Sequence, residues 1–207
     1  MPDYQLKMNL EEKSTAIKEL FEELEGEMKP FQQEGGLPCI SGCGFCCVNP
    51  NIAATPLEFL PLAFDLFSKG LAEEVANQLA LEEKPGNCIL YRPQSEDQKK
   101  GFCGSYPHRG MICRLFGSSA RRNNKSGTKE LITCKLLKEN FRADYLEATN
   151  RINEGMEIPI AAGWYTRLAD IDSYLSQQYP INQAILLALE SVLRYKFYQG
   201  EEGSEGQ

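Results

Sequence analysis

The sequence is poor in features that define several large classes of proteins. It contains a single histidine, His108, which excludes any mechanism or zinc motif that needs two histidines. No apolar run approaches the roughly 20 residues of a membrane helix. The first residues show no basic region followed by an apolar stretch, as a secretory signal would. We therefore expect a cytoplasmic protein with no membrane partner.

The chain also lacks an excess of basic residues. Its net charge of −7 and pI near 5.0 argue against a nucleic-acid binder that relies on a basic face, so we expect no DNA partner. Its 207 residues, 42% of them hydrophobic and 25% charged, suit one globular domain over 1–207. The acidic, Gly-rich residues 200–207 predict a disordered tail.

Apolar residues recur at helical spacing through much of the chain. Asn9 and Glu12 predict a capping box at the start of the first helix. We expect helices over 9–33, 55–68 and 71–84, around 107–116, and through the C-terminal third, where Pro180 opens the last one. No segment alternates as a strand would. The predicted fold class is all-α, a helical scaffold around an irregular cysteine-rich segment.

Eight cysteines dominate the middle of the chain. They all lie within residues 39–134: Cys39, Cys43, Cys46, Cys47, Cys88, Cys103, Cys113 and Cys134. Disulfides are one explanation, but cytosolic thiols stay reduced. Inert buried thiols account for one or two cysteines, not for four within nine residues. Metal ligation explains both the number and the clustering, so all eight are candidate ligands.

The spacing of the first four cysteines bears on which metal is bound. Cys46 and Cys47 are adjacent, and we expect their side chains to diverge rather than to share one tetrahedral ion. They would then serve different metals, or one of them is not a ligand. A cluster tolerates short spacings better than an ion, which favours an iron–sulfur cluster over zinc.

A second pattern overlaps this one. Cys39-x3-Cys43-Gly-Phe45-Cys46 matches the three-cysteine signature of radical S-adenosylmethionine enzymes, which hold a [4Fe–4S] cluster. The strand–helix alternation of that family's barrel does not follow in this sequence. The match supports a cluster more than it supports radical chemistry.

The complete cysteine set resembles the CxxCxxCC cysteine-cluster family, described as zinc- or iron-chelating. The opening Cys39–Cys47 block and the Thr55-Pro56-Leu57-Glu58 helix start are similar to that family. So is Cys103-Gly-Ser-Tyr106-Pro-His-Arg109-Gly110-Met-Ile-Cys113-Arg114, although Gly110 replaces the family's proline, which we expect to loosen this turn. Cys88 and Cys134 fall at the family's fifth and eighth cysteines.

The resemblance implies a binding property, and it extends to residues around the cysteines. Arg109 and Arg114 would offset the charge of clustered thiolates and donate N–H···S bonds, and Tyr106 would supply another donor. The predicted function is a protein that holds an iron–sulfur cluster or zinc. The alternative is a [4Fe–4S], S-adenosylmethionine-dependent enzyme such as a protein lysine methylase, because a related flagellin lysine methylase carries a similar block. A metal-stabilised interaction module, with an unknown protein partner, is the third possibility.

Overall fold

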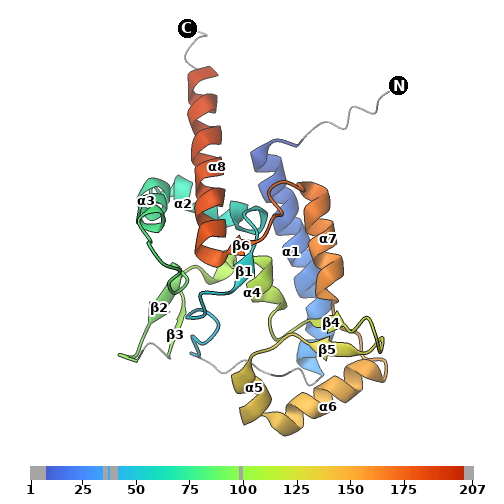
Figure 1. The fold of residues 1–207 in the computed structure, drawn as a ribbon. Coiled ribbons are helices and arrows are strands. Elements are labelled where there is room, and N and C mark those ends of the chain that lie inside the picture. Colours follow the sequence, from blue (N-terminus) through green and yellow to red (C-terminus); the bar gives the residue numbers. More distant parts are fainter. Residues whose placement is uncertain (1–7, 35–36, 38–41, 98–99, 203–207) are drawn as a thin grey trace, which may run out of the picture.

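The computed structural model describes residues 8–34, 37, 42–97 and 100–202 (Figure 1). Of the described residues, 55% are helical, which confirms a mainly helical fold. The prediction of a purely all-α fold is wrong, because three two-stranded antiparallel sheets occur in the described residues. Each strand has only two or three residues, too few to show the alternating pattern by which strands are recognised in a sequence.

Eight α-helices and two short 3-10 helices (η) occur in the described residues. They are α1 (Leu10–Gln33), η1 (Leu57–Phe59), α2 (Leu60–Ser68), α3 (Ala72–Ala80), η2 (Tyr106–His108), α4 (Met111–Leu115), α5 (Lys135–Asn140), α6 (Arg142–Asn153), α7 (Ala161–Ile171) and α8 (Ile181–Glu202). The capping box of α1 is present, as predicted: the Asn9 side chain accepts from the Glu12 N–H. No helix among these is long and apolar enough to cross a membrane.

The main core is formed by helices from both ends of the chain. Helix α2 packs against α1 and α8, and α3 packs against α8 (Figure 1). Buried apolar side chains from α1, η1, α2, α4, α7 and α8 form one continuous cluster. Helix α8 includes residues 200–202, the first part of the expected tail, while 203–207 lie outside the described residues.

The strands connect distant parts of the chain. Strand β1 (Ala53–Ala54) pairs with β6 (Tyr179–Pro180) and so joins the end of the first cysteine block to the start of α8. Strand β2 (Tyr91–Pro93) pairs with β3 (Gly101–Cys103) as a hairpin. Strand β4 (Ala120–Arg122) pairs with β5 (Lys129–Leu131). This last pair contributes to a smaller apolar cluster with α6 and the end of α1.

Candidate metal centre

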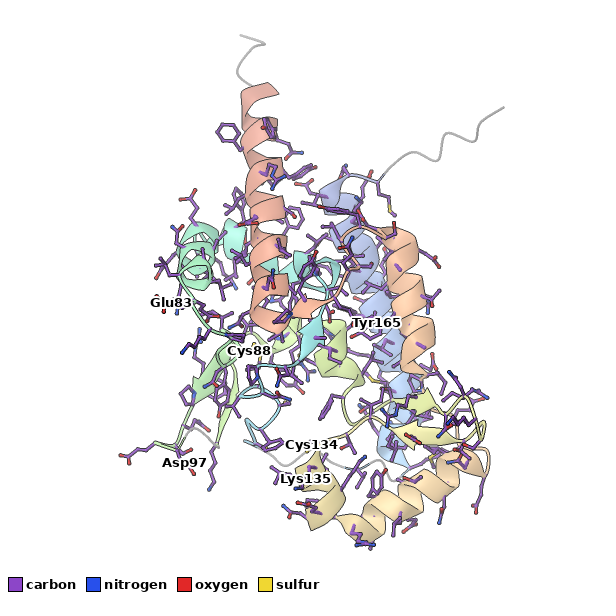
Figure 2. The ribbon with its side chains drawn as sticks, in the orientation of Figure 1. Glu83, Cys88, Asp97, Cys134, Lys135 and Tyr165 are labelled. Atoms are coloured by element: carbon purple, nitrogen blue, oxygen red, sulfur yellow. The ribbon has the colours of Figure 1, made fainter. Side chains whose placement is uncertain are left out.

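Seven of the eight cysteines lie in the described part of the chain, and Cys39 lies outside it. All seven are free thiols, and no disulfide joins any two of them. Figure 2 shows Cys88 above the β2–β3 hairpin and Cys134 at the start of α5. The predicted ligands therefore come from several separate elements.

Backbone hydrogen bonds fix the first cysteine block against the β2–β3 hairpin. The Cys88 N–H donates to the Cys47 carbonyl (2.8 Å), and the Gly101 N–H donates to the Gly42 carbonyl (2.9 Å). Cys43 forms an isolated antiparallel bridge with Lys100. Because these bonds join residues 40 to 60 positions apart, they place Cys46 and Cys47 next to Cys88, in the loop before β2, and next to β3, which carries Cys103.

Five thiols are close enough to shift one another's pKa, and we call them the five-thiol cluster: Cys46, Cys47, Cys88, Cys103 and Cys113. The pKa of Cys88 is raised to about 11, mainly by burial and to a lesser extent by the nearby Cys103 and Cys46 thiols. Burial also raises the pKa of Cys113, and Cys88, Cys46 and Cys103 add to this effect. The cluster thus combines the 42–48 turn, the Cys88 loop, β3 and α4.

The two adjacent cysteines do not diverge. Their sulfur atoms lie 3.9 Å apart, close to the edge of about 3.8 Å for a tetrahedral ion with metal–sulfur bonds near 2.3 Å. The expectation that these two side chains diverge is therefore wrong, whereas their binding to different metals stays a prediction. In this conformation no three Cys, His, Asp or Glu side chains among the described residues are close enough to hold one ion. Binding by the cluster would require side-chain rotation.

The two remaining described cysteines, Cys43 and Cys134, are not part of the five-thiol cluster. Burial raises the pKa of Tyr91 on β2, and the Cys47 and Cys43 thiols add to this rise, so Cys43 lies near the buried Tyr91 ring. The Cys134 sulfur accepts the Leu137 N–H at 3.4 Å and caps α5. A thiol in this position serves the helix terminus without any metal.

Tyr91 and two glycines determine how the first cysteine block fits the hairpin. A Cβ atom on Gly44 would meet the Tyr91 hydroxyl oxygen at 2.1 Å, and one on Gly101 would meet the Tyr91 ring at 2.5 Å. Real Cβ contacts are never this short, so both positions require glycine. The Gly44 between Cys43 and Cys46 therefore serves the close approach of the Tyr91 ring.

The three predicted polar contributors occupy different places. Burial raises the pKa of Cys103, and the charge of Arg109 opposes this rise; the same charge adds to the lowering of the Cys46 pKa that the Cys47 hydrogen bond causes. The Arg109 guanidinium lies 3.5 Å from the ring centroid of Tyr106, whose side chain is 60% exposed. Arg114 instead pairs with Glu25 of α1 and donates to the Pro107 and Arg109 carbonyls. The structure thus places Arg109 near the thiols, supported by Tyr106, and uses Arg114 to attach the η2–α4 turn to α1.

Sequence analysis did not identify two charged residues that lie near the thiols. Burial raises the pKa of Cys88 and Cys103, and the charge of Arg92 on β2 opposes this rise. Glu58 is fully buried, and burial raises its pKa to about 7. The available signal for Glu58 was the Thr55-x-x-Glu58 spacing of a capping box, which we interpreted only as a helix start.

Gly110 is buried beside Glu58. A Cβ atom at this position would lie 2.6 Å from Glu58 Oε2 and 2.8 Å from the Phe59 ring. The backbone angles of Gly110, φ −64° and ψ 169°, are ordinary. The glycine that departs from the family's proline is therefore required for close packing, rather than serving to loosen a turn.

Comparison with known proteins agrees with this arrangement. Residues 38–140 match the model of the CxxCxxCC family, whose description is "Putative zinc- or iron-chelating domain". The chain belongs to the CxxCxxCC family through this segment. No curated protein and no solved structure matches the chain. The CxxCxxCC segment contains all eight cysteines, together with Glu58 and Arg109.

Proposed function

We propose that this protein binds a metal centre through the five-thiol cluster, with Cys39, Cys43 and Cys134 as the further predicted ligands. The observation that carries the proposal is the convergence of five thiols from four separate elements. Thiolates suit zinc and iron, as the family description requires. Arg109 and Arg92 would offset part of their negative charge. We also propose a cytoplasmic location, where free thiols persist.

Two metals remain candidates, each favoured by a different observation. The 3.9 Å separation of the Cys46 and Cys47 sulfurs suits one edge of a tetrahedral zinc or iron ion. The number of converging thiols favours a second metal site beside the first, because one tetrahedral ion, like one iron–sulfur cluster, takes only four thiolates. The Cys39-x3-Cys43-x2-Cys46 spacing favours an iron–sulfur cluster, because it matches the three-cysteine signature of enzymes that hold one.

The enzyme alternative would need an iron with an open coordination position for S-adenosylmethionine. The five-thiol cluster and Cys43 offer six thiols, more than a four-iron cluster needs. A fully thiolate-ligated cluster has no position for substrate, so this supply of ligands supports binding over catalysis.

The test is elemental and acid-labile sulfide analysis of protein purified without oxygen, together with its visible spectrum. We expect zinc, or iron with sulfide, at stoichiometric levels. The matched variants are Cys88→Ser in the cluster and Cys134→Ser at the α5 cap. We expect the first substitution to cause the larger loss of metal. Folded wild-type protein without metal would overturn the proposal.

A further inference from the structure

Glu58 is a buried carboxylate that joins two segments far apart in the sequence. Its Oε1 atom accepts the Thr55 N–H (2.6 Å) and the Thr55 hydroxyl (3.1 Å), within the turn that begins η1. Its Oε2 atom accepts the Ile112 N–H (2.9 Å), 54 positions further along the chain. The Met111 N–H also contributes to the hydrogen bonding of this carboxylate.

These bonds reach the helix that carries one of the five clustered thiols. Helix α4 has only five residues, and its N-cap residue, Gly110, has no side chain to cap it. So short a helix is unstable on its own. Cys113 directly follows Ile112, and its N–H donates to the Gly110 carbonyl. Glu58 therefore supplies, from another element, the cap that holds the turn of Cys113.

The packing around Gly110 provides an independent observation. A Cβ atom at position 110 would lie only 2.6 Å from Glu58 Oε2, so only glycine lets the chain pass this close to the carboxylate. In addition, no Lys, Arg or His in the described part of the chain forms an ion pair with Glu58, although its side chain is fully buried. A buried carboxylate without a cation is costly. Ion pairing therefore does not explain its place, whereas hydrogen bonding to α4 does.

We propose that Glu58 is the positioning residue of the metal centre, orienting Cys113 as a ligand through the first turn of α4. This inference rests on the proposed function. It assigns the buried glutamate to the site through the hydrogen bonds that it accepts, not as a ligand. Hydrogen bonds that orient ligands in this way are typically worth 10- to 100-fold in metal affinity.

The test compares Glu58→Gln with Glu12→Gln in metal-loaded protein purified without oxygen. Glu12 is the matched control because it holds the same capping-box position on α1, at an exposed site. Glutamine keeps the size of Glu58 but turns an NH2 group toward N–H donors. The measurements are the rate of metal release to a colorimetric chelator and the alkylation of each cysteine, followed by peptide mass spectrometry.

We expect Glu58→Gln to release metal at least tenfold faster than wild type and to expose Cys113 to alkylation, while Cys46 and Cys88 stay protected. Glu12→Gln should behave as wild type. A merely structural defect would expose all the cysteines together, so selective exposure of Cys113 is the decisive result. Wild-type release and protection in Glu58→Gln would overturn the inference.

Gly110→Ala provides a second route if Glu58→Gln does not fold. Its methyl group would displace the Glu58 carboxylate from α4 while leaving the glutamate in place. We expect the same selective exposure of Cys113 with the helix content of wild type. Protection equal to wild type would overturn the inference. Wild-type protein that holds no metal would instead overturn the proposed function, so the two failures are distinguishable.

Discussion

Individual thiols in the five-thiol cluster differ in acidity because of their immediate neighbours. The Cys46 and Cys47 thiols share a hydrogen bond, which lowers the pKa of Cys46 and raises that of Cys47. Arg109 lowers the pKa of Cys46 further by its charge, whereas burial opposes this shift. The adjacent pair therefore favours the state in which one sulfur is protonated and the other is a thiolate.

This difference predicts selective alkylation of the metal-free protein. At pH 7, we expect iodoacetamide to modify Cys46 several times faster than Cys47 or Cys88, because the thiolate is the nucleophile. Lowering the pH through the lowered pKa of Cys46 should slow its reaction, whereas Cys47 should react only at alkaline pH. Peptide mass spectrometry after brief labelling measures both rates.

Two variants serve as controls for that prediction. Cys47→Ala removes the thiol that is hydrogen-bonded to Cys46, and Arg109→Gln removes the nearby positive charge. Each should slow the modification of Cys46 at pH 7 without changing that of Cys134. Equal labelling rates at all the cysteines of the wild-type protein would contradict the predicted order.

At the scale of elements, the fit between the first cysteine block and the β2–β3 hairpin depends on one buried ring. Gly44→Ala would place a methyl group against the Tyr91 side chain. We expect a loss of about 1–3 kcal/mol in the free energy of unfolding, as for other overpacked sites, together with less metal per chain. Urea unfolding and metal analysis measure the two effects.

Gly86→Ala is the matched control for this element. A Cβ atom at Gly86 would have only Glu82 Oε1 nearby, at 3.8 Å, which is an ordinary contact. The variant should remain within about 0.5 kcal/mol of wild type, as most surface substitutions do. If both alanine variants lost the same stability, the Tyr91 fit would not be the cause.

The predictability of each element follows from the distance over which its stabilising contacts act. Helix α1 is stabilised by a local apolar stripe and a local capping box, so its bounds could be predicted to within one residue. The β2–β3 hairpin depends on the contact of Tyr91 with Gly44 and Gly101, and no short sequence pattern records that contact. The second role of Glu58 depends on a bond across 54 positions. Local spacing therefore identifies the cysteines as candidate ligands, but it does not reveal the contacts that hold them in place.

At the scale of the whole molecule, the CxxCxxCC segment is not independent of the helical core. Helix α2 lies within this segment, yet it packs against α1 and α8. Leu57, Leu60 and Leu62 are fully buried in the main core. The boundary between the helical core and the part that a metal would hold therefore runs through the segment itself. Its helix α2 packs directly against α1 and α8, whereas the hairpin region reaches the same cluster through Cys88, Leu90 and Tyr91.

Metal removal should reveal this division. Chelation under reducing conditions should increase amide hydrogen exchange in residues 42–48 and 88–104, because a metal would crosslink these short elements. Helices α1, α2 and α8 should keep their protection, since α2 packs directly against both α1 and α8. Exchange measured by mass spectrometry, with and without chelator, locates both regions. Cys88→Ser, studied without chelator, should give the same pattern and so separate metal loss from any direct effect of the chelator. A single cooperative loss of protection across α2 and the hairpin would instead show that the metal supports the whole core.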